Sequence, residues 1–172
     1  MSAQTDELAA ILARIDAARQ AFAHALAALS DAQMNAVRFD DGSTLKDLLA
    51  HFAFWDQRFL HAVQPEPPDA FRLVPPAIAD IPYKEDMHWA DQVNARIRQI
   101  YAQHTLADVK REFEQTSARM DAFLRAVTPH DVYDKDGLSA ALGIPFDEFM
   151  RGIYEHYEAH AGDLRRLELQ LK

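Results

Sequence analysis

Residues 44–63, which read TLKDLLAHFAFWDQRFLHAV, decide the fold class. Apolar side chains recur there at steps of three and four residues: Leu48, Phe52, Trp55 and Phe59. This period is that of one face of an α-helix. Thr44 is a residue type that caps helix N-termini, and Asp47 follows three positions later, where an acidic side chain is favoured. The stretch therefore predicts an amphipathic helix that begins at Thr44 and ends before Pro65.

The helical period continues on both sides of this stretch. It predicts four further helices, over residues 4–29, 86–103, about 105–127 and 145–170. Asp40 to Ser43 read as a turn, and residues 128–143 are expected to be irregular because Thr128-Pro129, Gly137 and Gly143 break helices. Strand signals are weak throughout. Long amphipathic helices with short connections predict an all-α bundle, and 172 residues suit a single domain over 1–172.

Residues 64–85 interrupt this pattern, because they hold six of the eight prolines of the chain. Such proline density excludes a regular helix. A loop of this length in a compact domain is often functional, and its apolar side chains suggest that it packs on the bundle. Two interpretations stay open: a lid over a pocket, or a long connection that crosses one end of the bundle.

Charge and composition exclude several classes of function. The net charge is −9, and no Lys/Arg run exceeds the pair Arg165-Arg166, so neither nucleic acid nor a membrane surface is an expected partner. No apolar run approaches the ~18 residues of a membrane span. The start of the chain lacks a signal-peptide pattern, which makes a cytoplasmic location the expectation. The absence of cysteine excludes zinc–thiolate sites and a thiol nucleophile.

Two histidines of the last expected helix agree in spacing and phase. His156 and His160 are four residues apart, so their rings lie one turn apart on one helix face. Apolar residues fall within roughly a quarter turn of both histidines: Phe149, Ile153, Leu164 and Leu167. The pair is therefore expected to point into the bundle, where its nitrogens need a metal, a carboxylate or water. His51 flanks the apolar stripe of residues 44–63 and is the expected third member.

Three imidazoles with one open position are the arrangement of a catalytic metal site. Imidazole suits zinc, nickel, iron or copper, and the pattern does not choose among them. The HExxH motif of metalloproteases is absent. The alternative is that these are interior histidines hydrogen-bonded to Asp47, Asp56 or Asp163.

Three segments together resemble the DinB/YfiT-like four-helix bundles, and most closely the ClbS/DfsB-type branch. They are TLKDLLAHFAFWDQRFL, WADQVNARI and GIYEHYEAHAGDLRRL. The resemblance implies an antiparallel four-helix bundle, here with an extra helix and the proline-rich loop. It also implies a divalent metal, zinc or nickel, on His51, His156 and His160. Homodimers and use of a low-molecular-weight thiol are further implications.

Three hypotheses about function follow. The first is a metal-dependent enzyme that acts on a small molecule, of hydrolase or thiol-transferase type. In it, Tyr157 and Asp47 are the candidate catalytic residues. Asp47 and Asp163 are candidates to orient the imidazoles, and Trp55 is expected to line the pocket. The second is a metal-free ClbS/DfsB-like hydrolase or resistance protein. The third is a non-enzymatic protein that binds a small molecule.

Overall fold

The computed structural model describes residues 3–63, 81, 87–134, 138–139 and 145–170. Its helices are α1 (Ala3–Ala27), α2 (Asp31–Ala36), α3 (Leu45–Val63), α5 (Met87–Tyr101), α6 (Leu106–Ala126), α7 (Pro129–Tyr133) and α9 (Phe146–Gln170). No β-strand occurs within these ranges, so the all-α prediction is confirmed. The proline-rich segment 64–85 lies outside the described residues except for Ile81, and so do both interpretations of it.

A hydrogen-bonded cap sets the start of α3, as predicted from Thr44 and Asp47. The Thr44 amide and hydroxyl donate to Asp47 Oδ2 at 2.8 and 2.7 Å, and the Asp47 amide donates back to Thr44 Oγ1 at 3.1 Å. Thr105 and Asp108 form the same pair before α6. Each pair satisfies amides that the first helical turn leaves without a helical partner.

Two short helices correct the predicted connections. Residues 128–143 were expected to be irregular, but Thr128 caps α7 in a box with Asp131, and proline occupies the first turn of that helix. A proline there costs no hydrogen bond, because the first amides of a helix have no helical acceptor. Ser30 and Gln33 form a similar box before α2, which the sequence pattern did not indicate.

The chain divides into two compact units. One comprises residues 1–39 with 123–172, and the other comprises residues 40–122. The prediction of a single domain over 1–172 stays a prediction. Among the described residues, no helix combines the length and apolarity that crossing a membrane requires.

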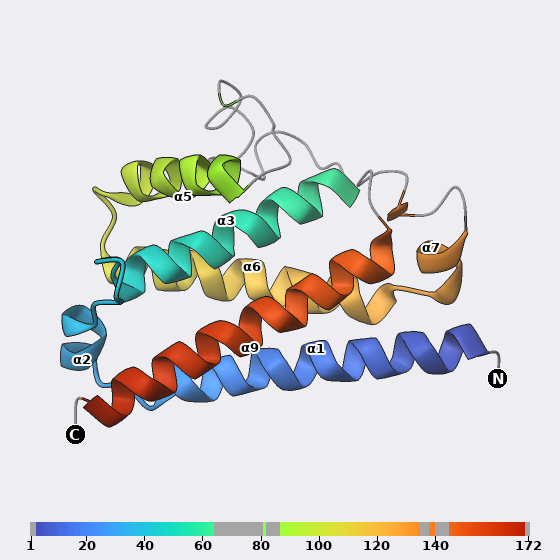
Figure 1. The fold of residues 1–172 in the computed structure, drawn as a ribbon, viewed down its shortest axis with the longest axis horizontal. Coiled ribbons are helices and arrows are strands. Elements are labelled where there is room, and N and C mark those ends of the chain that lie inside the picture. Colours follow the sequence, from blue (N-terminus) through green and yellow to red (C-terminus); the bar gives the residue numbers. More distant parts are fainter. Residues whose placement is uncertain (1–2, 64–80, 82–86, 135–137, 140–144, 171–172) are drawn as a thin grey trace. The chain divides into compact units, whose positions relative to one another are not determined.

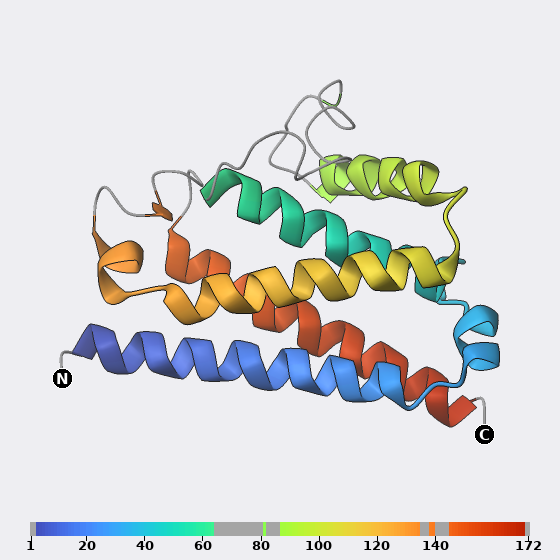
Figure 2. The same ribbon diagram turned by 180° about the vertical axis from the view of Figure 1, so that it is seen from behind.

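In the first unit, α1 and α9 lie side by side and run in the same direction (Figures 1 and 2). Two exposed ion pairs join the helices in this register: Arg14 to Glu158 at 3.0 Å and Arg151 to Glu7 at 3.4 Å. Both helices supply buried apolar side chains: Leu8, Ile11, Ile15, Phe22, Phe146, Met150, Ile153 and Leu164.

In the second unit, α3 packs against α5 and polar side chains tie both helices to α6. The buried Gln57 amide donates to Glu112 and Thr116, each at 3.0 Å, and the Tyr101 hydroxyl donates to Glu112 at 2.7 Å. Burial, with help from this carboxylate, raises the pKa of Tyr101 well above its usual range. Lys46 Nζ donates to the carbonyls of residues 101, 102 and 104, closing the C-terminal end of α5. The start of α3 is thereby held in place.

Candidate metal centre

His156 and His160 project from the same face of α9. Their ring centroids are 4.9 Å apart, with the edge of one ring toward the other. Both residues are half-buried, so they are less enclosed than the predicted inward-facing pair. The spacing of one helical turn has the predicted consequence that two imidazoles meet side by side.

An acidic residue on the next turn of α9 orients one of these rings. His160 Nδ1 lies 3.2 Å from Asp163 Oδ2, and the other oxygen of that carboxylate pairs with Arg166. An ionised carboxylate only accepts hydrogen bonds, so a neutral His160 ring that donates to it carries its hydrogen on Nδ1 and has its lone pair on Nε2. This contact of Asp163 was expected both for a metal site, where such carboxylate–histidine pairs commonly support the ligands, and for interior histidines without a metal.

His51 lies on α3 and is half-buried. Its ring packs edge-on against Phe52 and Trp55, at centroid distances of 5.8 and 6.2 Å. Its Nδ1 is 3.0 Å from Asn94 Oδ1 on α5. Reasoning from the sequence missed Asn94, although the residue stands in the segment WADQVNARI beside the buried Val93. The one feature of the sequence that could have indicated Asn94 was a polar amide next to an apolar helix stripe.

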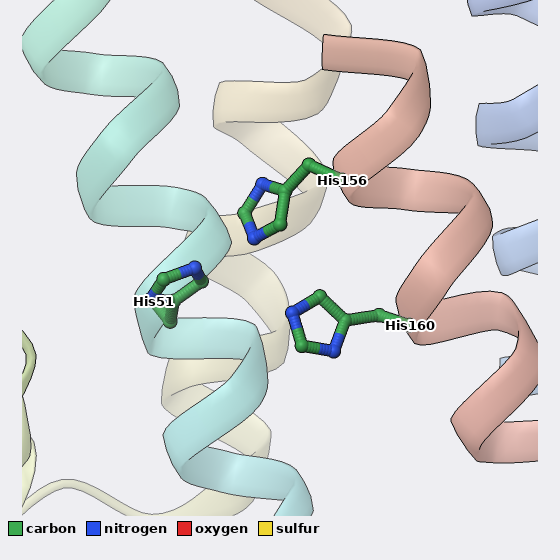
Figure 3. A group of neighbouring side chains, drawn as sticks. All are labelled: His51, His156 and His160. Carbon is green, nitrogen blue, oxygen red and sulfur yellow. The ribbon is translucent and has the colours of Figure 1, made fainter. Parts of the chain in front are cut away.

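The three predicted histidines form one candidate ligand set (Figure 3). His51, His156 and His160 each offer one ring nitrogen, and these atoms all lie within 4.8 Å of one another. All three donors are imidazoles, the ligand type that zinc, nickel and copper accept. Two of the rings have an oxygen beside Nδ1, at Asp163 and Asn94. The set therefore fits a divalent metal ion.

Tyr157 and Asp47, the two predicted catalytic residues, make hydrogen bonds to residues outside the histidine set. The Tyr157 hydroxyl accepts a hydrogen bond from Arg19 Nη1 at 3.0 Å, and its ring meets Phe22 edge-on at 5.6 Å, so the side chain faces α1. Asp47 Oδ2 accepts the two hydrogen bonds from Thr44 that cap α3. The catalytic role proposed for each residue stays a prediction.

A sequence model of the DinB superfamily matches residues 14–164, a span that includes all three histidines. Neither the comparison with curated proteins nor the comparison with solved structures gives a match. The family match covers most of the chain, and the chain therefore belongs to the DinB superfamily.

Proposed function

We propose that the protein is a metal-dependent enzyme that acts on a small molecule and holds its ion on His51, His156 and His160. The observation that carries the proposal is that the three ligand nitrogens lie within 4.8 Å of one another. Zinc or nickel suits such a set. When bound, a divalent ion supplies Lewis acidity that lowers the pKa of a ligated water or thiol, or polarises an electrophile.

The residues of the chain have two tasks in this proposal. The three histidines would hold the ion, and three protein ligands would leave a position for another ligand, as catalytic sites require. Asp163 accepts a hydrogen bond from His160 Nδ1 and thereby keeps Nε2 available for the ion.

The composition of the chain limits how thiol chemistry could take place. The protein has no cysteine, so a thiol nucleophile must come from solution. A transferase version of the reaction therefore needs a low-molecular-weight thiol as its second substrate. A hydrolase version needs only water. Supplying the purified protein with each nucleophile in turn distinguishes the two versions.

Aromatic side chains beside His51 support a partly apolar substrate. Trp55 is half-buried and touches the His51 ring. The Arg58 guanidinium lies over the rings of Trp55 and Trp89, 5.3 and 5.0 Å from their centroids. Such cation–π contacts stabilise the positions of the two indoles.

Elemental analysis of protein purified without immobilised nickel tests the proposal. We expect about one divalent ion per chain in the wild type, and loss of that ion in His156→Ala, because two remaining imidazoles bind far more weakly. His24→Ala is the matched control, since His24 is an exposed histidine of α1. Equal metal content in His156→Ala and His24→Ala would refute the metal site.

Two alternatives predict other outcomes. A metal-free hydrolase or resistance protein of the ClbS/DfsB type would keep its activity and thermal stability in EDTA. A non-enzymatic binding protein would be stabilised by bulky apolar ligands and by no metal. We further propose a homodimer, which light scattering on the eluted protein tests directly.

A further inference from the structure

Two nitrogen atoms of α3 converge on one oxygen atom of α5. Trp55 Nε1 lies 3.1 Å from Asn94 Oδ1, and His51 Nδ1 lies 3.0 Å from the same oxygen. His51 and Trp55 are four residues apart, so they share a face of α3. The convergence lies within one compact unit, in which α3 packs against α5.

The tryptophan decides which way the amide group faces. An indole N–H can only donate a hydrogen bond, so the amide atom opposite it must be an acceptor. Of the two ends of the Asn94 amide, only Oδ1 accepts. Turning the amide over would set its NH₂ group against the indole N–H. Trp55 therefore fixes Asn94 with the oxygen toward α3.

The oriented amide in turn decides where His51 carries its hydrogen. A carbonyl oxygen has two lone pairs, and Trp55 occupies one of them. The second lone pair accepts only if His51 Nδ1 carries a hydrogen. A neutral imidazole has one such hydrogen, so the lone pair of His51 lies on Nε2. The histidine side chain in water prefers the opposite tautomer, in which the hydrogen would block that nitrogen.

The surroundings hold the donor in place. The Trp55 ring packs against Trp89 at a centroid distance of 5.8 Å, and Arg58 lies 5.3 Å from its centroid. Because these contacts hold the indole, its N–H bond keeps its direction. The hydrogen bond to Asn94 Oδ1 then keeps the amide in its orientation.

We propose that Asn94 is a positioning residue that selects the Nδ1–H tautomer of His51 and so presents Nε2 as a ligand, with Trp55 locking the amide. As far as it concerns a metal, the proposal rests on the proposed function. The tautomer itself is a property of the metal-free protein. It can therefore be tested before any ion is added.

The experiment reads the tautomer directly in metal-free protein labelled with ¹⁵N. Long-range ¹H–¹⁵N correlation spectra at about pH 8, where the imidazole is neutral, separate protonated from unprotonated ring nitrogens. His51→Gln assigns the signals of His51 by their disappearance. We expect wild-type His51 with the hydrogen on Nδ1.

Three variants test the cause. Asn94→Leu has a similar size but no acceptor, and should shift His51 toward the Nε2–H tautomer. Asn94→Asp keeps an acceptor and should restore Nδ1–H. Asn35→Leu, an exposed asparagine of α2, is the control and should change nothing. If Asn94→Leu does not fold, Trp55→Phe serves in its place, because it frees the amide to turn and should produce a mixture of tautomers.

Metal affinity provides the second measurement. With zinc as the probe, Asn94→Leu should bind about 10- to 100-fold more weakly than the wild type, and Asn94→Asp should not show this loss. An Nε2–H tautomer in the wild type, or an unchanged tautomer in Asn94→Leu, would overturn the proposal. If the tautomer shifts as expected but no protein binds zinc, the proposed function fails and the positioning of the ring stands.

Discussion

The Tyr157→Phe substitution removes one oxygen atom from the core that α1 and α9 form. Tyr157 is 2% exposed, and Arg19, which donates to its hydroxyl at 3.0 Å, is 8% exposed. The change leaves a buried guanidinium N–H without that acceptor. The aromatic ring stays, and so does the stacking of Arg19, which lies 4.9 Å from the ring centroid. The hydrogen bond from Arg19 is lost.

The expected loss follows from the kind of bond removed. Hydrogen bonds to charged groups contribute about 1.5–3 kcal/mol. Arg19 keeps its contact with the Tyr157 ring and makes a further interaction, so we expect the lower part of that range. A loss of about 1.5–2 kcal/mol corresponds to a fall in Tm of about 3–8 °C for a chain of this size.

Urea unfolding followed by circular dichroism measures this loss, and Tyr154→Phe is the matched control. Tyr154 is on the same helix and is 7% exposed, and Arg14 stacks over its ring at 3.9 Å. Its hydroxyl has no hydrogen bond within the described part of the chain, so we expect a change below about 0.5 kcal/mol. If Tyr157→Phe were no more destabilising than Tyr154→Phe, the Arg19 bond would contribute nothing and the reasoning would be wrong.

Two further substitutions test helix caps. Thr44→Ala removes the hydroxyl that pairs with Asp47 and should destabilise the protein by about 1 kcal/mol in urea unfolding; no change would mean that α3 does not depend on its cap. Hydrogen bonds from Thr105 lower the pKa of Asp108. Its carboxylate therefore stabilises the fold above its unfolded pKa of about 3.9, and this contribution is lost as the pH falls through the lower folded value. Asp108→Asn should accordingly lose less stability than the wild type between about pH 5 and pH 2, and equal losses would contradict this assignment.

Local patterns explain why so much of the fold could be predicted. The long helices rest on a period of three to four residues, and the starts of α3 and α6 rest on a threonine followed three residues later by an aspartate. The same threonine–aspartate spacing precedes α7, but Pro129 was interpreted as a break. The parallel direction of α1 and α9 was not predictable in this way, because it depends on pairs such as Arg14 with Glu158, 144 residues apart.

The candidate site shows the same difference between contacts that are local in the sequence and contacts that are not. His156, His160 and Asp163 lie within two turns of α9, so spacing alone could bring them together. The partner of His51 is 43 residues away on another helix, and no period in the sequence links positions 51 and 94. The three histidines and Asp163 could therefore be predicted from the sequence, but Asn94 could not.

The orienting oxygens also limit which ring nitrogen of each histidine can bind an ion. Two histidines four apart occur by chance on many helices, and the spacing leaves either nitrogen of each ring to carry the hydrogen. An acceptor at Nδ1 removes that freedom, because it fixes the lone pair on Nε2. Asp163 does this for His160 and Asn94 does it for His51, by different chemistry and from different helices. Two independent acceptors thus have the same consequence for the lone pair, and the spacing of the histidines alone does not produce it.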